Sequence, residues 1–586
     1  MTLLRLSLLS LLMIGPGIGC GGKTTENPGE DRDTGSLGDS VIDSFEPIHD
    51  DGPFPDSDLP PPDAPIGVAT DKLDLLFVVD NSISMADKQA ELARAIPGML
   101  RDLTVPDPTG AKRAFASVHV GVITSSLGSH GTSACAVEIT SRSSNDAAHL
   151  LPRTGEGGGS GYALGPTGMI TAAPCPTPVA ASALRWAFDP TKDMAEFYGS
   201  SGATTVATAA TCVVQSAKEN GCGYEETLEA MYHFLMDPAP YQKAEVKCTF
   251  GISGDACGSN KIVVEGLDTQ ILTQRAAFLR PDSTVVIVVL SDENDFSLKP
   301  AGLNWLPWGY GKGQMQHGWG RCADVPDDFE PETATDFVKL HTDFKCFSCF
   351  EDASDPNCKV PWATTPLNAD VDGRNLRGFQ QTKRFGYNFL WSRDRYVGGL
   401  TSSTIVGSDG KPGANPLFAG GRAPSNVIFA PIVGLPPSLV KGADGVPKAT
   451  LSATEWSKLV GPIGTRDVHM VESIKPRAGV PRFAGDRTVD LVNGGDRDIT
   501  DGDDLQYACI TPRATTGPGN DCDGPSAGMR NPLCTSTGTQ AYYKAFPGLR
   551  ALRIAQSVNG YAASICDPAL GNVLRGLVDR IKPLIK

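Results

Sequence analysis

The chain has 586 residues, of which 40% are hydrophobic and 20% charged, and its formal net charge is -16. This length can bury a large core and exceeds a single minimal domain, so we expect one large domain with insertions or two domains. Residues 21–70 hold 12 acidic and two basic residues, so most of the negative charge lies in one short segment. A nucleic-acid partner would require a basic face, so no such partner is expected.

The first residues have the features of an export signal. Arg5 precedes an apolar run, Leu6–Ile18, which is too short to span a membrane as a stable helix. Cys20 follows this run, an arrangement that resembles the lipobox of bacterial lipoproteins, although Gly17 stands where that motif usually has Leu. The resemblance implies that residues 1–19 are a signal peptide and that lipid is attached to Cys20. The alternative is an ordinary signal peptide that leaves Cys20 unmodified.

Residues 20–70 are predicted to be a disordered tether. They are rich in Gly, Pro, Asp and Ser and poor in aromatic residues, so they cannot bury enough surface to fold. No other apolar stretch reaches the roughly 18 residues that a membrane span needs. We therefore expect contact with the membrane through the lipid alone. The expected location is the bacterial cell envelope, as an outer-membrane lipoprotein that faces either the periplasm or the cell surface.

The next stretch predicts a buried strand that ends in oxygen ligands. Leu75–Val79 has no polar alternation, as in a parallel strand covered on both faces, and helical spacing begins near Met85. Asp80, Ser82 and Ser84 therefore lie on a strand-to-helix turn, at the sheet edge where ligands bind in open α/β sheets. One carboxylate and two hydroxyls are hard donors that suit Mg²⁺ or Mn²⁺. The alternative is that they only cap the helix.

The sequence Asp-Asn-Ser-Ile-Ser that follows this strand resembles the metal-ion-dependent adhesion site of von Willebrand factor type A domains. The resemblance implies an α/β fold with a doubly wound, mostly parallel sheet, here over residues 71–586 and enlarged by disulfide-rich insertions. It also implies that this site binds a divalent cation. Mg²⁺ is the preferred ion, and Mn²⁺ and Ca²⁺ are the alternatives. One coordination position of this cation would bind an acidic group on a protein or glycan partner.

Two further segments extend this scheme. Ser117–Thr124 predicts a strand that flanks the first one, and residues 128–211 are expected to be loop-like. A helix begins shortly after Gly221. In the family, the turn before this helix carries a threonine that binds the metal ion. In the family this threonine lies about five residues before an Ala-Leu pair. Counting back by that distance from Ala230 reaches Glu225, not a threonine. We take Glu225 as the ligand, with Thr227 after a shift of register as the alternative, and acids that merely complement the helix dipole as a third possibility.

The most strand-like run, Thr284–Leu290, also ends in acids. The resemblance places Asp292 in the position of the family's distal metal-site aspartate. Glu293 and Asp295 leave open whether a second cation binds there. A solvated acidic loop is the alternative for these acids.

The remainder combines insertions with two core elements. Residues 296–425 are expected to be an insertion, Asn426–Val433 a strand, and residues 436–540 a loop-rich segment. Its acidic part, residues 486–504, allows but does not establish calcium binding, because the glycine lies at the wrong offset for an EF-hand. Apolar residues at spacings of three and four within Pro568–Ile585 predict a final helix.

Fourteen cysteines remain besides Cys20, an even number that predicts up to seven disulfides of undetermined connectivity in an exported protein. Cys346 and Cys349 form a C-x-x-C pair, but no second pair stands at zinc spacing and no strand-to-helix context supports a redox site. Structural disulfides are therefore the preferred interpretation.

These features favour a binding or adhesion protein over an enzyme. The alternatives are a structural envelope protein whose cation only stabilises the fold, and a metal-dependent hydrolase. No histidine is recognisably placed beside the strand-tip acids to act as a general base. The sequence does not identify the ligand or the oligomeric state.

Replacing Cys20 by serine tests the anchor. We expect Cys20→Ser to move the protein from the membrane fraction to the soluble fraction, because the lipid is the only predicted attachment. Fractionation followed by a salt wash measures this. A variant that stays with the membrane after the wash would place the anchor elsewhere.

Overall fold

A computed structural model gives the fold. It describes residues 67–105, 114–128, 130, 145–151, 160–164, 170–174, 206–219, 221–222, 224–248, 260–301, 320–326, 329–331, 334–348, 354–356, 376, 378–499, 504–517, 521–522 and 530–586. The predicted signal peptide, Cys20 and nearly all of the tether lie outside these ranges.

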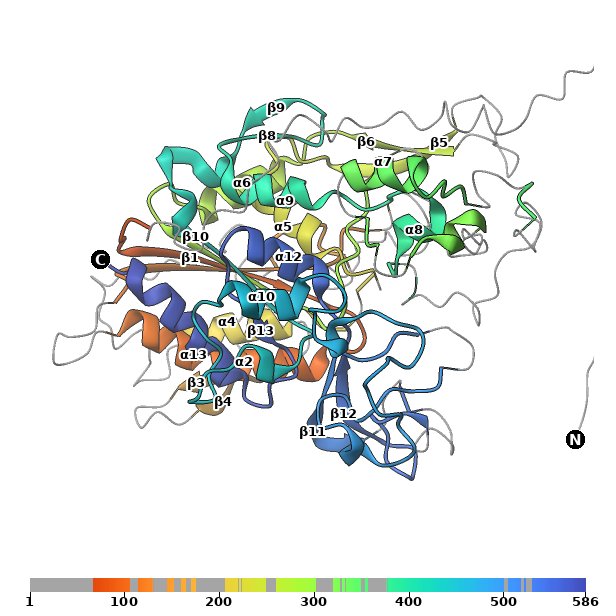
Figure 1. The fold of residues 1–586 in the computed structure, drawn as a ribbon. Coiled ribbons are helices and arrows are strands. Elements are labelled where there is room, and N and C mark those ends of the chain that lie inside the picture. The colour runs from red at the N-terminus through yellow and green to blue at the C-terminus, as the bar shows by residue number, and fades with distance from the viewer. Residues whose placement is uncertain are drawn as a thin grey trace, which may run out of the picture.

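A five-stranded sheet forms the centre of the molecule, and all its neighbouring strands are parallel (Figure 1). The strand order is β13-β10-β7-β1-β2. The strands are β1 (Lys72–Val79), β2 (Ser117–Thr124), β7 (Thr284–Leu290), β10 (Val427–Val433) and β13 (Ala563–Ser564). The predicted α/β class is confirmed, as are the four strands predicted from apolar runs. Such runs are buried on both faces of a parallel sheet.

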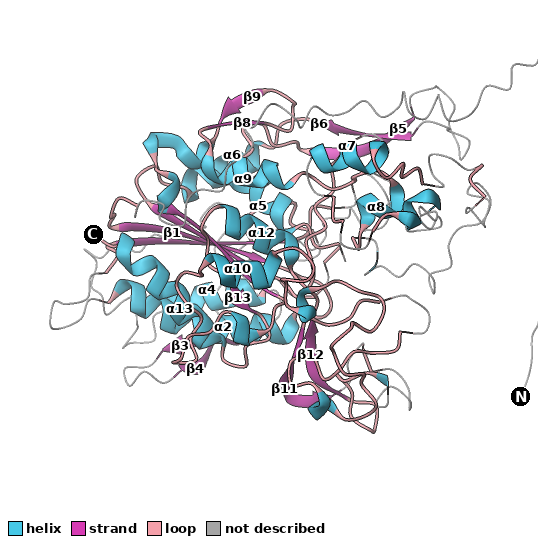
Figure 2. Ribbon diagram, viewed as in Figure 1, coloured by secondary structure: helices cyan, strands magenta, loops and turns pink. Residues whose placement is uncertain are grey.

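Helices cover both faces of the sheet (Figure 2). One group contains α2 (Ala86–Thr104), α4 (Val206–Gln215) and α13 (Leu570–Ile581), with α2 in contact with the other two. The other contains α5 (Thr227–Leu235), α6 (Thr269–Phe278), α9 (Arg393–Thr401) and α12 (Leu549–Ser557). The final helix was predicted, and α13 buries the apolar face that predicted it. Among the described residues, no helix combines the length and apolarity that a membrane span requires.

Short hairpins and helices surround this core. Four antiparallel pairs are β3 (Ser160–Leu164) with β4 (Ile170–Pro174), β5 (Lys243–Cys248) with β6 (Asn260–Glu265), β8 (Thr404–Val406) with β9 (Pro412–Ala414), and β11 (Cys509–Gly517) with β12 (Gln540–Ala545). The remaining helices are α7 (Ala334–Thr342), α8 (Gln381–Phe385), α10 (Ala453–Val460), and the 3-10 helices η3 (Gly320–Asp324), η5 (Pro416–Gly421), η6 (Pro424–Asn426), η7 (Pro437–Leu439), η8 (Val468–Met470), η9 (Arg487–Val489) and η10 (Lys582–Leu584).

The prediction of a loop-like segment over residues 128–211 was wrong in part. The β3–β4 hairpin and the start of α4 lie within it. The strands of this hairpin are rich in glycine and alanine, so they lack the apolar alternation that identifies a strand in sequence.

Part of residues 296–425 belongs to the main core. Helix α9 packs against α5 and α12, and Trp391, Tyr396 and Leu400 are buried in the same apolar cluster as the strands of the sheet. The segment expected as an insertion therefore also completes one helical layer.

Three disulfides are formed within the described residues: Cys322–Cys346, Cys509–Cys566 and Cys522–Cys534. Cys346 pairs with Cys322 and not with Cys349, which removes the C-x-x-C redox interpretation. Cys509–Cys566 joins the start of β11 to the chain just after β13.

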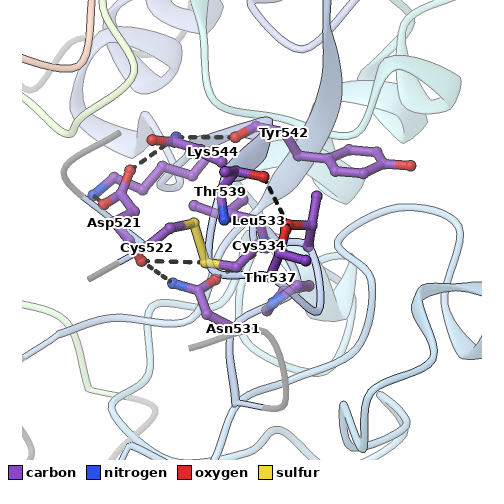
Figure 3. The surroundings of a disulfide bond; sticks show 12 residues. Asp521, Cys522, Asn531, Leu533, Cys534, Thr537, Thr539, Tyr542 and Lys544 are labelled. Atoms are coloured by element: carbon purple, nitrogen blue, oxygen red, sulfur yellow. Dashed lines mark hydrogen bonds and ion pairs between the residues drawn. A yellow bond between two sulfur atoms is a disulfide. The ribbon is translucent and has the colours of Figure 1, made fainter. Parts of the chain in front are cut away.

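The third disulfide, Cys522–Cys534, lies beside the β11–β12 hairpin (Figure 3). There the Lys544 ammonium contacts the Asp521 carboxylate at 2.9 Å, and Asn531 Nδ2 donates to the Asp521 carbonyl oxygen at 3.1 Å. The preference for structural disulfides is confirmed for these three pairs.

Removing each of two disulfides should destabilise the fold by an amount that depends on loop length. The cysteines are 57 residues apart in Cys509–Cys566 and 12 apart in Cys522–Cys534. The chain-entropy model gives losses of about 4 and about 3 kcal/mol respectively. Denaturant unfolding of the two Cys→Ala double variants measures this. A larger loss for Cys522/Cys534 would show that native contacts, not loop closure, decide the effect.

Candidate metal centre

The candidate site lies at the carboxyl ends of β1 and β7, where the strand order reverses. Val79 is in register with Thr124 on β2 and with Leu290 on β7, so the three strands end at the same level. The Asp80 N–H donates to the Leu290 carbonyl at 2.9 Å and extends this pairing to the first residue of the turn. Ligands bind in open α/β sheets at such a reversal.

The structure brings together the predicted oxygen donors that follow β1 and β7. The Ser82 N–H donates to Asp80 Oδ1 at 2.7 Å, and the hydroxyls of Ser82 and Ser84 are 3.3 Å apart. The Ser84 hydroxyl donates to Asp292 Oδ1 at 3.1 Å. A residue that the sequence did not single out, Ser291, donates its hydroxyl to Asp80 Oδ2 at 2.7 Å. The first two contacts order the turn after β1, and the last two, Ser84 to Asp292 and Ser291 to Asp80, connect the two strand tips across the reversal.

Glu225 also faces this cluster. Its buried carboxyl group lies close enough to Glu293 for a hydrogen bond and close enough to Asp80 for repulsion. Its carbonyl accepts the N–H of Phe296 at 2.8 Å, which ties the turn before α5 to the loop after β7. The Thr227 hydroxyl instead donates to Asp295 Oδ1 at 3.2 Å. Of the two alternatives for the threonine position, Glu225 is therefore the one beside Asp80.

A buried lysine that sequence reasoning missed is part of the site. The Lys88 ammonium forms an ion pair with Asp292 Oδ2 and contacts the Ser84 carbonyl oxygen at 3.3 Å. Both side chains of the ion pair are almost fully buried. Lys88 lies one helical turn after Ser84, so the spacing of four residues was a signal that it shares a face with the hydroxyls.

Close packing holds the neighbouring turns in place. Asn81 Oδ1 accepts the hydroxyls of Ser126 at 2.8 Å and Ser125 at 3.3 Å, and the Asn81 carbonyl accepts the Gly221 N–H at 2.9 Å. A Cβ atom at Gly221 would overlap the Asn81 side chain. Glycine is thus required there by this close approach, which positions the turn that leads to Glu225.

Burial and mutual repulsion make the acids of the cluster reluctant to ionise. Burial, followed by repulsion from Asp292, raises the pKa of Asp80 to about 6. The same two causes raise the pKa of Glu293 to about 8, and burial with repulsion from Glu293 and Asp80 raises the pKa of Glu225 well above its usual range. The cluster therefore has more carboxyl groups than Lys88 can pair with, and burial favours their protonated forms when no cation is bound.

The donor set fits a hard divalent cation in its chemistry. All five predicted ligands, Asp80, Ser82, Ser84, Glu225 and Asp292, offer oxygen, and their excess negative charge would be relieved by a cation. No three His, Cys, Asp or Glu side chains in the described part of the chain are already grouped as a metal site. Lys88 is bonded to Asp292, so a cation there would have to share this carboxylate with the ammonium or displace it.

A cavity gives access to one side of the cluster. A space of about 40 Å³ is lined by Glu225, Glu293 and Asn294, which is enough for a water or an ion. Asn294 and Glu472 also line a larger cavity of about 710 Å³. The two cavities thus adjoin at Asn294 and Glu472, while Glu225 and Glu293 line only the smaller one.

The β11–β12 hairpin and the residue after it also border the cluster. The Phe546 N–H, just after β12, donates to the Asp292 carbonyl at 2.8 Å, and the Tyr543 ring centroid is 5.5 Å from Lys88 Nζ. Asp80 and Asp292 are consequently inaccessible to solvent, whereas Ile83 between the two serines is 62% exposed.

The second acidic segment has arginine partners. Asp496 pairs with Arg477 at 2.6 Å. The other described pairs are Asp498 with Arg482 and Asp504 with Arg497. Asp501 and Asp503 lie outside the described residues. Asp496, Asp498 and Asp504 are thus engaged with arginines of the chain itself, which does not favour calcium at these three carboxylates.

Comparison with known proteins adds no assignment: no family model, no curated protein and no solved structure matches the chain. The fold and site define an α/β protein with a parallel sheet and an acidic, hydroxyl-rich cluster at the reversal of strand order.

The raised pKa of Asp80 predicts a pH effect in the absence of divalent cations. Because this pKa rises from 3.8 to about 6 on folding, the folded chain binds more protons over that interval, and stability falls as the pH rises through it. Asp80→Asn removes this penalty. We expect its stability relative to wild type to increase by about 3 kcal/mol between pH 3 and pH 7.

Denaturant unfolding in chelator over this pH range measures the difference. Asp498→Asn, at an exposed ion pair, is the control for the loss of a carboxylate. A difference between Asp80→Asn and wild type that does not change with pH would contradict the raised pKa.

Proposed function

We propose that the chain is an exported, lipid-anchored protein resembling von Willebrand factor type A domains, and that it binds a partner through a divalent cation at the strand tips. Mg²⁺ fits best, and Mn²⁺ or Ca²⁺ are alternatives. The observation that carries the proposal is the convergence of Asp80, Ser82, Ser84 and Asp292 at the reversal of strand order, with Glu225 beside them. The proposed partner is a protein or glycan with an acidic group.

In this proposal each residue has a distinct role. Asp80, Asp292 and Glu225 would hold the cation with charge, and the hydroxyls of Ser82 and Ser84 would contribute neutral donors. The bound cation would supply a positive centre that attracts a carboxylate of the partner. Ser291 orients the Asp80 carboxylate through its 2.7 Å hydrogen bond, and Lys88 keeps Asp292 neutralised when no cation is bound.

The structural alternative has an observation in its favour. Asp80, Asp292 and Lys88 are buried, and the Phe546 backbone covers Asp292. A cation in such surroundings could stabilise the fold without contacting a partner. The difference between the two functions is therefore whether partner capture depends on the cation.

The hydrolase alternative has less support. Histidines that could act as a general base have partners away from Asp80 and Asp292: His119 contacts the Phe278 carbonyl at 2.7 Å, and His130 contacts Glu226 at 2.8 Å. His233 lies 3.6 Å from Asp237. A water at the strand tips would thus lack a base from these three histidines.

Melting curves test the cation site. At a Mg²⁺ concentration 100 times the dissociation constant, wild type should gain about 2.7 kcal/mol relative to chelator if the unfolded chain does not bind Mg²⁺. Asp80→Ala should lose this increment. It removes a ligand and a repelling charge together, so its stability in chelator need not be lower than that of wild type.

Two further variants complete this test. Asp146→Asn replaces another buried carboxylate, which accepts the Thr124 N–H at 2.9 Å, and should keep the Mg²⁺ increment. Lys88→Met frees Asp292 from its ion pair and should show a larger increment than wild type. If Asp80→Ala and wild type gain equally from Mg²⁺, the site assignment fails. Capture of envelope proteins or glycans, with and without chelator, then separates a binding role from a structural one.

A further inference from the structure

A third cavity lies at the opposite end of the sheet from the acidic cluster. Its volume is about 470 Å³, within the range of small-molecule pockets. The first residues of β10, Val427–Phe429, line it, whereas the acidic cluster adjoins the carboxyl ends of β1 and β7. The two sites are therefore independent in position.

The walls of this cavity are mainly apolar. Leucine, valine, isoleucine, phenylalanine and proline side chains come from several segments, among them Leu400 of α9, Val558 after α12 and Leu584 of η10. Gly67, the first described residue, also lines the cavity. Such walls favour the hydrocarbon part of a ligand, because burying it removes apolar surface from water.

Among the described residues that line the cavity, Arg580 carries the one charged side chain. It lies in the last turn of α13, and its Nη2 donates to the Asn559 carbonyl at 2.9 Å. Its Nε is buried without a hydrogen-bond partner, and within the described residues no carboxylate forms an ion pair with it. Burial lowers the pKa of this guanidinium, with no nearby acid acting against it.

Neighbouring arginines and lysines of the same region differ. Arg575 on α13 is half exposed and faces Asp444 at 4.0 Å, and Lys582 pairs with Asp579 at 2.5 Å. Arg580 thus combines three conditions that favour an anion: partial burial, an unsatisfied donor, and no counterion among the described residues. A guanidinium with free donors binds a carboxylate strongly and with defined geometry.

We propose that this cavity binds an organic monocarboxylate with an apolar body, its carboxylate on Arg580 and its hydrocarbon part against β10, α9 and η10. The volume accommodates a chain of about eight carbons or an aryl ring with a short linker. Such a ligand places its carboxylate against the Arg580 guanidinium and supplies a negative charge that no described carboxylate provides. The apolar walls disfavour small hydrophilic anions, which would leave them unfilled.

Calorimetric titration of the purified chain with octanoate tests the proposal, with octanamide as the neutral analogue of the same shape. Octanoate should bind, and octanamide should bind roughly tenfold or more weakly, because a hydrogen bond to a charged group is lost. Arg580→Gln should weaken octanoate binding by a similar factor and leave octanamide nearly unchanged. Arg575→Gln is the matched control on the same helix and should bind octanoate like wild type.

A variant that fills the cavity provides a second test. Ala423 lines the cavity in extended backbone, so Ala423→Phe should fill it without backbone strain and abolish binding of both compounds. Equal melting temperatures of the unliganded variants show that they fold. Equal affinity for octanoate and octanamide, an unchanged affinity in Arg580→Gln, or no octanoate binding at millimolar concentration would each overturn the proposal. Mg²⁺ and chelator should have no effect, so this outcome is separate from that of the strand-tip site.

Discussion

The parallel pairing of β1 with β7 is the constraint on which the strand-tip site depends. Asp80 and Asp292 are separated by more than 200 residues, and only the register of Val79 with Leu290 brings their turns to the same level. Each strand is buried on both faces, so a shift along the pair would break backbone hydrogen bonds that no water could replace. The sheet therefore fixes the site more firmly than the loops that carry its side chains.

Bringing these turns together concentrates negative charge in a place with little water. Two buried acids elsewhere in the core have guanidinium partners: Asp74 pairs with Arg280 at 2.7 Å, and Glu229 pairs with Arg395 at 2.9 Å. At the strand tips Lys88 balances Asp292, while the raised pKa values of Asp80, Glu225 and Glu293 reflect charge that remains unbalanced. The same imbalance that favours a cation also makes the apo site sensitive to pH.

The two ends of the sheet thus differ in the kind of ionisable group that lacks a counterion among the described residues. At the carboxyl ends, carboxylates exceed their counterions, and the proposed partner of the site is a cation. Near the start of β10, the guanidinium of Arg580 has no described counterion, and the proposed partner is an anion. In both cases desolvation is the physical cause, because a charge removed from water gains most from a partner of opposite sign.

The sequence by itself determined the elements and the residues at their ends. Apolar runs identified β1, β7 and β10, valines and an isoleucine that fit a sheet interior identified β2, and helical spacing identified α13. Such patterns follow directly from backbone geometry. Asp80 and Asp292 were found because each follows such a run. The glycine- and alanine-rich β3–β4 hairpin was missed, since its strands lack the apolar alternation that identifies a strand in sequence.

Only the tertiary structure decided how distant side chains pair. The ion pair of Lys88 with Asp292, the hydrogen bond of Thr227 to Asp295, and the disulfide of Cys346 with Cys322 all join residues whose proximity depends on packing. The isolation of Arg580 in an apolar cavity depends on packing in the same way. Local sequence sets the periodicity and direction of an element. Which charges then meet, and which stay unpaired, depends on strand register and on burial that the whole chain creates.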